Sequence, residues 1–165
     1  MKRVWAPWRI DYILGKKPKK CFLCVPRTKG YKARHYILSE SAHSIVLLNK
    51  YPYSAGHLMV IPERHTADLE GLSTEELTDL FSLVRFASRV LKKAVNCDGL
   101  NIGANIGSAA GAGAKEHFHV HIVPRWNGDH NFMPVLSDTM VISEYLQKTY
   151  DRLLPWFHNE RQSST

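Results

Sequence analysis

The sequence has no apolar run close to the roughly 18 residues that a membrane-spanning segment requires. Basic residues stand near its start, but the apolar stretch of a secretory signal does not follow them. The chain contains only 3 cysteines, an odd number that does not suit a framework of disulfides. Internal repeats and low-complexity tracts are also lacking. We therefore expect a cytoplasmic protein with no membrane partner and no disulfide framework.

The length of 165 residues, with 44% hydrophobic and 22% charged residues, is typical of one globular domain. The formal net charge of +7 favours an anionic partner, and both nucleotides and nucleic acids are anionic. Nucleic acid is the less favoured partner because no stacked-aromatic or groove-reading motif accompanies the charge. The basic residues gathered between Lys16 and Arg34 are typical of a solvated face.

Hydrophobic periodicity predicts an α+β fold with an antiparallel sheet. Ser73 and Glu76 form a capping-box signature ahead of a long helix at 74–95. Weaker helical periodicity occupies 141–157, and the last eight residues are expected to fray. The predicted strands lie at 44–49, 57–62, 99–105 and 117–123.

We expect three parts along the chain. Residues 1–35 form an N-terminal extension that carries two cysteines, and residues 36–135 form the core of the domain. Residues 136–165 form a C-terminal helix and tail. The extension is rich in lysine, glycine and proline around its cysteines, which favours irregular structure there.

Histidine occupies every second position from His117 to His121, and apolar residues fill the positions between. In a strand this pattern directs the three imidazoles to one face and the apolar side chains to the core. The Cα atoms of His117 and His121 would lie about 13 Å apart, which is too far for both to bind one zinc ion. The three histidines therefore divide their roles. Because imidazole is a nucleophile at neutral pH and its neighbours can donate hydrogen bonds to phosphate, the row predicts phosphorus chemistry through a covalent histidine intermediate.

The Gly/Ala-rich loop at 106–114 precedes this row. Gly107, Gly111 and Gly113 allow backbone N–H groups to come close to phosphate oxygens. Such loops are more often simple connections, so the loop supports the prediction only because it adjoins the histidines.

The run His-Phe-His-Val-His-Ile-Val at 117–123 resembles the motif that defines the histidine triad (HIT) superfamily, and the resemblance extends over roughly 21–129. Residues 49–65 are similar to the family's ribose-binding strand and the hairpin after it. The Trp-Ala-Pro-Trp-Arg run at 5–9 and the residues at 116–117 and 123–129 are similar to a bacterial branch that contains diadenosine tetraphosphate phosphorylases.

The resemblance implies a HIT-like fold, with an antiparallel sheet of about five strands, one long helix packed on it and a C-terminal helix. It also implies an enzyme that acts on the α-phosphate of dinucleoside polyphosphates such as diadenosine tetraphosphate. His119 would attack the α-phosphorus to give a nucleotidyl-histidine, and water or phosphate would then release the nucleotide. A homodimer through the helix and a central strand is implied as well, and no organic cofactor is implied. The alternative is a nucleotide-binding HIT protein with little or no catalysis.

Further roles follow from the same resemblance. His121 would contact phosphate oxygens, Asn49 the ribose hydroxyls and Leu47 the base, while Asn105 would lie on the phosphate side. The full nucleotide site that the resemblance implies consists of Leu47, Asn49, Lys50, Asn105, Gly111, Gly113, His119 and His121.

The sequence departs from the family pattern just before the triad. Many members carry Gly-Gln-Ser/Thr there, whereas this chain has Gly-Ala-Gly-Ala-Lys-Glu at 111–116. The side chain that usually assists the leaving group is therefore missing. Backbone N–H groups or Lys115 are the candidates to replace it.

Cys21 and Cys24 form a C-x-x-C motif, which by itself fits ordinary or redox-active thiols as well as a metal site. In zinc-carrying relatives such a pair is joined by two histidines, which by the resemblance are His65 and His117. A Cys₂His₂ set is closed and tetrahedral, so the zinc would be structural. Cys97 is expected to be a small buried hydrophobe.

Overall fold

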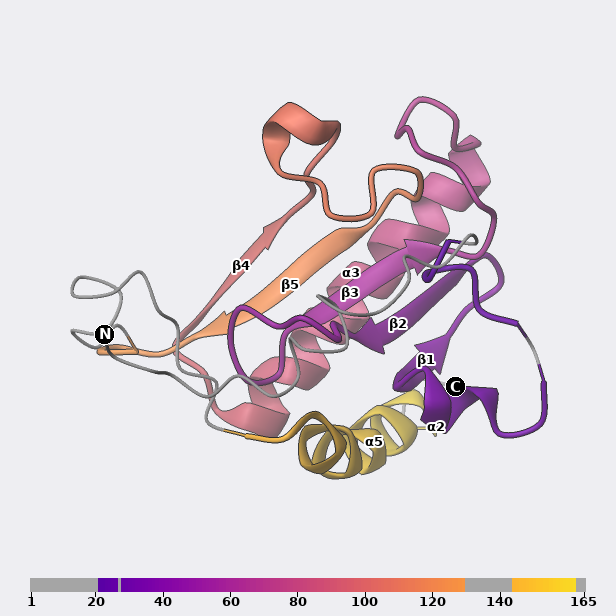
Figure 1. The fold of residues 1–165 in the computed structure, drawn as a ribbon. Helices are drawn as coiled ribbons and strands as arrows, with labels where there is room; N and C mark the ends of the chain where they lie inside the picture. Colours follow the sequence, from indigo (N-terminus) through magenta and orange to yellow (C-terminus); the bar gives the residue numbers. More distant parts are fainter. Residues whose placement is uncertain (1–20, 27, 130–143, 163–165) are drawn as a thin grey trace, which may run out of the picture.

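The fold is an antiparallel sheet of five strands with helices on one face and at one end (Figure 1). The computed structural model describes residues 21–26, 28–129 and 144–162. The strand order is β1-β2-β3-β5-β4. The elements are α2 (Tyr31–Arg34), β1 (Ile37–Glu40), β2 (Ser44–Leu48), β3 (Leu58–Pro62), α3 (Thr74–Val95), β4 (Gly99–Gly103), the 3₁₀ turn η2 (Ser108–Ala110), β5 (Val120–Arg125) and α5 (Leu146–Gln162).

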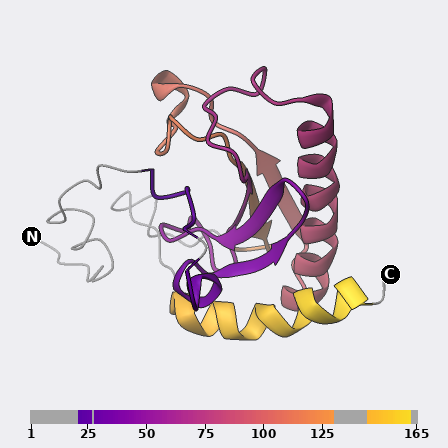
Figure 2. The same cartoon turned by 90° about the vertical axis from the view of Figure 1, so that its right-hand side faces the viewer.

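Helix α3 covers one face of the sheet, and the main core lies between them (Figure 2). The predicted bounds of this helix are confirmed, and so is its capping box: Ser73 accepts from the backbone N–H of Glu76, whose carboxylate accepts from the backbone N–H of Ser73. Every second residue of the inner strands points to this helix. The buried residues of the main core from the strands and from the segment before β5 are Leu38, Val46, Leu48, Leu58, Val60, Phe118, Val120 and Ile122.

The other face of the sheet carries a smaller apolar cluster. Its strand residues are Ile37, Ile45, Leu47, Met59 and Ile61, and Leu23 of the N-terminal segment packs on them. Two of the three inner strands, β2 and β3, are consequently buried along their whole length. Their sequences are nearly continuous apolar runs because both faces are covered.

Strand β5 begins later than the sequence predicts. It starts at Val120, so His117 and His119 precede the strand and do not lie in it. Continued pairing with β3 beyond Val60 would place Phe118 opposite Pro62, and proline has no N–H to donate to the ladder. The backbone N–H of Phe118 instead donates to the carbonyl oxygen of Thr66 at 2.6 Å.

The C-terminal helix also departs from its predicted bounds. The structure describes it from Leu146 to Gln162, whereas periodicity predicts 141–157, and residues 141–143 lie outside the described part of the chain. The expectation that 158–162 fray is wrong because an ion pair and a hydrogen bond hold this end: Glu160 pairs with Lys93 at 2.5 Å, and Arg161 donates to the Ser39 hydroxyl at 2.8 Å. Such contacts between distant segments are invisible to local composition.

Helix α5 crosses one end of the sheet and meets α3 (Figure 2). Tyr150, Leu153 and Phe157 enter the main core, so this helix shares the core of the sheet. Among the described residues, no helix is both long enough and apolar enough to cross a membrane. The similarity noted at 5–9 and all the basic residues before Cys21 lie outside the described residues.

Candidate functional site

Four polar side chains lie buried on the sheet face that points away from α3. Asn49 directly follows β2, and His57 directly precedes β3. His121 lies in β5 opposite Met59 of β3, and His119 lies two residues before it. All four are buried, which is unusual for such polar groups unless they are hydrogen-bonded. The sheet therefore gathers amide and imidazole groups that are far apart in the sequence.

His119 and His121 have their ring centroids 4.7 Å apart, with ring planes at 84°. The Nδ1 atom of His119 lies 2.8 Å from the carbonyl oxygen of His117. A carbonyl only accepts hydrogen bonds, so Nδ1 of His119 carries a proton. In the neutral ring Nε2 then keeps its lone pair, as a nucleophile requires.

His57 joins His121 across the sheet. Its Nε2 atom lies 3.0 Å from Nδ1 of His121, and its Nδ1 accepts from the backbone N–H of Tyr53 at 3.0 Å. Burial, with smaller contributions from His121 and His119, lowers the pKa of His57 from 6.5 to about 3. Burial and His119 likewise lower the pKa of His121 to about 4. Both rings are therefore neutral at pH 7.

Asn49 is held at the end of β2 by its own turn. Its Oδ1 accepts from the backbone N–H of Tyr51 at 2.9 Å, which directs its amide nitrogen toward His57. The nitrogen is 3.4 Å from the nearer ring atom of His57, a long hydrogen bond.

The other residues expected to bind nucleotide lie in different environments. Leu47 is buried in the smaller apolar cluster, and Lys50 is exposed. Asn105 is half-buried two residues after Gly103, which pairs with His121. Gly111 and Gly113 are exposed in the loop before the triad.

In this loop, Gly111 has a φ of 84°, in the left-handed region that favours glycine. A Cβ added at Gly111 or at Gly113 would meet nothing within 4 Å. The loop therefore leaves open space beside its backbone, although the N–H of Gly111 itself donates to the carbonyl oxygen of Ser108 at 3.0 Å.

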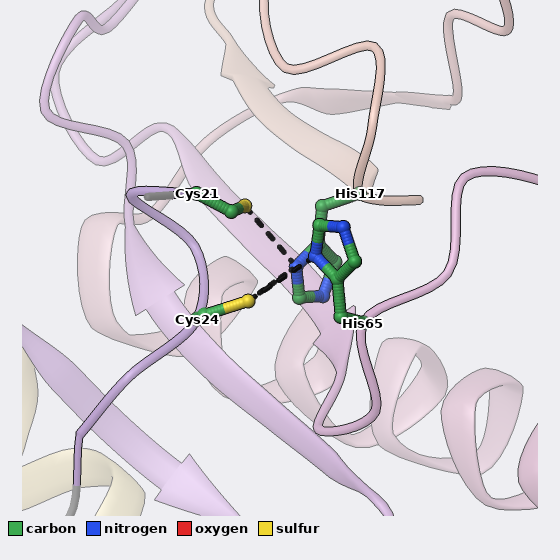
Figure 3. Close-up of side chains that lie close together, drawn as sticks. All are labelled: Cys21, Cys24, His65 and His117. Atoms are coloured by element: carbon green, nitrogen blue, oxygen red, sulfur yellow. Dashed lines mark hydrogen bonds between the residues drawn. The ribbon is translucent and has the colours of Figure 1, made fainter. Parts of the chain in front are cut away.

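Cys21, Cys24, His65 and His117 converge into one cluster, whose ligand atoms all lie within 4.8 Å of one another (Figure 3). The cysteines come from the N-terminal segment, His65 from the segment after β3 and His117 from the segment before β5. These four side chains form a group that could hold a metal ion.

The spacing within the cluster fits a tetrahedral ion. Bonds of about 2.3 Å to sulfur and about 2.1 Å to nitrogen place neighbouring sulfur and nitrogen ligands about 3.6 Å apart. His117 Nδ1 lies 3.5 Å from the sulfur of Cys21 and 3.7 Å from that of Cys24, and His65 Nδ1 lies 3.2 Å from Cys24. The other ring nitrogen of His117 bonds to the Pro62 carbonyl at 2.9 Å, which fixes the ring with Nδ1 toward the sulfurs.

The three histidines of the row thus lie in two environments. His117 turns to the cysteines, whereas His119 and His121 face each other near His57.

His57 was not among the site residues predicted from the sequence. The one local signal was a histidine placed at the start of an otherwise apolar inner strand, directly after a turn.

The chain matches a family model described as the HIT domain over residues 32–128. It belongs to the histidine triad family. It is 33% identical over 159 residues to the "AP-4-A phosphorylase" of Mycobacterium tuberculosis, a match that covers 90% of this chain and 80% of that protein. It is 41% identical over 86 residues to the "Bis(5'-nucleosyl)-tetraphosphatase [asymmetrical]" of Schizosaccharomyces pombe, which covers 52% of this chain and 47% of that protein.

Solved HIT structures share the fold. A zinc-bound histidine triad family protein from Mycobacterium smegmatis superposes with a TM-score of 0.65 at 25% identity, over 78% of this chain and 88% of the other. A histidine triad nucleotide-binding protein from Sulfolobus tokodaii superposes with a TM-score of 0.63 at 31% identity, over 78% and 84%. The predicted HIT fold is therefore confirmed.

The lowered pKa of His57 predicts how stability depends on pH. Because the folded chain binds a proton at this ring less readily than the unfolded chain, the stabilisation is present above pH 6.5 and is lost as the pH falls toward 3. Between pH 7 and pH 5 the free energy of unfolding should fall by about 2 kcal/mol more in the wild type than in His57→Gln. Urea unfolding at each pH measures this difference. His158→Gln, an exposed site on α5, should keep the wild-type dependence, and equal slopes in wild type and His57→Gln would contradict the prediction.

Proposed function

We propose that this HIT protein is a nucleotidyl hydrolase or transferase that acts on the α-phosphate of dinucleoside polyphosphates of the diadenosine tetraphosphate kind. The observation that carries the proposal is the imidazole of His119, whose Nδ1 is bonded to the His117 carbonyl and whose Nε2 keeps its lone pair. The names of the M. tuberculosis and S. pombe relatives support the substrate class.

The reaction proceeds in two displacements at phosphorus. Nε2 of His119 forms a bond to the α-phosphorus, and the bond from that phosphorus to the bridging oxygen breaks, so that ATP leaves when the substrate is diadenosine tetraphosphate. Phosphate or water then attacks the same phosphorus and the P–N bond breaks. ADP or AMP is released, and the imidazole is restored.

The surrounding residues are assigned to binding. Asn49 binds the ribose hydroxyls, Leu47 lies beside the base, and Lys50 is a further nucleotide-binding residue. Asn105 binds on the phosphate side, where the backbone of Gly111 and Gly113 approaches the phosphate oxygens. His121 binds the same oxygens, because its ring lies 4.7 Å from that of His119.

A nucleotide-binding HIT protein with little or no catalysis is the second candidate. It is favoured by the loop at 111–116, where the chain has alanine and lysine in place of the glutamine of many relatives. The two candidates differ in whether a nucleotide becomes attached to His119.

His119→Ala should lower kcat for diadenosine tetraphosphate by at least about 10⁴-fold, because no other group in the site replaces the nucleophile. The fold should be retained, since His119 donates only to a backbone carbonyl, and circular dichroism checks this. His158→Ala on α5 is the matched control and should keep full activity. Full activity of His119→Ala would refute the nucleophile.

The second acceptor is identified by the products. Incubation of the wild type with diadenosine tetraphosphate should release ATP together with AMP if water is the acceptor, or together with ADP if phosphate is the acceptor. ADP that forms only when phosphate is added identifies a phosphorylase. If the protein binds AMP and releases no nucleotide under either condition, the non-catalytic alternative is correct.

The second part of the proposal is that zinc is the metal of the cysteine and histidine cluster. Two thiolates and two neutral imidazoles are a ligand set that zinc prefers, and a closed set of four leaves no position for substrate. Cys21, Cys24, His65 and His117 would hold the ion, whose chemistry here is structural: it ties the N-terminal segment to the two segments beside the triad. A zinc-bound HIT neighbour supports this assignment.

Purified protein should contain about one equivalent of zinc per chain. Cys24→Ser should lower the zinc content below about half an equivalent and lower the melting temperature, because it removes one of four ligands. Cys97→Ser changes a cysteine outside the cluster and should leave both unchanged. Metal analysis with thermal unfolding tests this, and zinc-free wild type with an unchanged melting temperature would contradict it.

The third part of the proposal is a homodimer through β4. Strand β4 is at one edge of the sheet, and its residue Ile102, which pairs with Ile122 on the α3 side, remains 49% exposed. An open edge strand beside an exposed apolar side chain fits pairing with the same strand of a second copy.

Ile102→Lys should therefore convert a dimer to a monomer, because it places a charge at the centre of the interface. Light scattering after size exclusion measures the mass. The control is Trp156→Lys, which changes an apolar residue of similar exposure on α5, at the other edge of the sheet. A monomeric wild type, or an Ile102→Lys variant that stays dimeric, would contradict the proposed interface.

A further inference from the structure

His57 is a buried imidazole for which the proposed reaction has no direct use. It is 1% exposed, and each of its ring nitrogens has a close partner. The Tyr53 ring packs on it with a centroid distance of 4.6 Å. A buried histidine in such a setting has a fixed ring orientation, so the position of its proton can be worked out from its partners.

The proton positions follow from one backbone group. The N–H of Tyr53 can only donate, so Nδ1 of His57 is the acceptor and carries no proton. Because the ring is neutral, its proton is on Nε2 and is donated to Nδ1 of His121 at 3.0 Å. Nδ1 of His121 is thus an acceptor, and its own proton is on Nε2.

The other contact of His57 does not choose between the tautomers. The Asn49 amide nitrogen lies 3.4 Å from Nδ1 and 3.5 Å from Nε2 of His57, almost equally far from both ring nitrogens. The depressed pKa values of His57 and His121 keep both rings neutral at pH 7, as the assignment requires. The contact that decides between the tautomers is therefore the backbone N–H of Tyr53.

We infer that His57 is a positioning residue that fixes His121 as an Nε2–H donor, so that the two catalytic imidazoles meet the phosphoryl group in opposite tautomers. His119 is protonated on Nδ1 and offers a lone pair to phosphorus, whereas His121 is protonated on Nε2 and offers a proton to oxygen. This inference rests on the proposed function for its catalytic consequence, but the tautomer itself follows from the geometry.

The consequence is chemical. A hydrogen-bond donor that is already oriented stabilises the negative charge that grows on phosphate oxygens during the displacement. In the opposite tautomer His121 would direct a lone pair at those oxygens and repel them.

The experiment compares His57→Leu with His57→Gln. Leucine fills much of the same volume but offers no donor, whereas the side-chain amide of glutamine can place an N–H group near the position of the imidazole Nε2. Nitrogen-15 NMR of the histidine rings shows which nitrogen of His121 is protonated, and it does so without substrate. The wild type and His57→Gln should show Nε2–H on His121, and His57→Leu should show a shift toward Nδ1–H.

Kinetics with diadenosine tetraphosphate should follow the tautomer. We expect kcat to fall about 100-fold in His57→Leu with little change in KM, and to stay within about tenfold of wild type in His57→Gln. If His57 acted only on stability, its variants would have a lower yield or melting temperature, and glutamine would not restore kcat relative to leucine.

The outcomes separate this inference from the proposed function. A wild type that shows His121 protonated on Nδ1 overturns the inference, whatever its activity and whether or not the leucine variant folds. Equal kcat in the leucine and glutamine variants of an active enzyme overturns the catalytic role of His57. A wild type that turns over no dinucleoside polyphosphate but has His121 protonated on Nε2 refutes the proposed function and leaves the tautomer assignment standing.

Discussion

The hydrogen bond from Nδ1 of His119 to the carbonyl oxygen of His117 is the interaction on which the site depends. This carbonyl is free to accept because residues 117–119 leave the β ladder, which ends where Pro62 lacks an N–H. The same departure turns the His117 ring toward the two cysteines. One break in strand pairing therefore orients the candidate nucleophile and supplies a ligand to the metal cluster.

The metal cluster and the phosphate site are neighbours for this reason. His117 belongs to the cluster through its side chain and to the site through its backbone. Thr66, which follows the ligand His65, accepts from the backbone N–H of Phe118. A metal that joins the N-terminal segment to both of these segments would hold the backbone that orients His119, although it lies outside the chemistry.

Much of the fold could be predicted from the sequence, because its signals are local. The helix from Thr74 to Val95 has a capping box and a clear apolar period, and its predicted bounds agree with the structure. The start of β5 and the end of α5 could not be predicted, since they depend on Pro62 and Glu160, which are distant in the sequence from the segments they affect. The resemblance to a family brought Cys21 and His65 into one prediction, which spacing alone did not justify.

His57 shows where reasoning from sequence stops. Its residue type and burial could be anticipated, but its bond to His121 requires the register of β3 against β5. The assignment of a proton to each ring nitrogen requires in addition the turn that aims the Tyr53 N–H at this ring. Hydrogen bonds to the partners of a catalytic imidazole decide which of its nitrogens is protonated, and such bonds can be identified only from the three-dimensional structure.

The central claim is that Nε2 of His119 forms a bond to phosphorus. The most direct measurement is to quench the wild-type protein during turnover of diadenosine tetraphosphate and to map the modified peptide by mass spectrometry at alkaline pH. The account predicts an adenylyl group on His119. Turnover with no adenylated peptide, or with the adenylyl group on another residue, would contradict it.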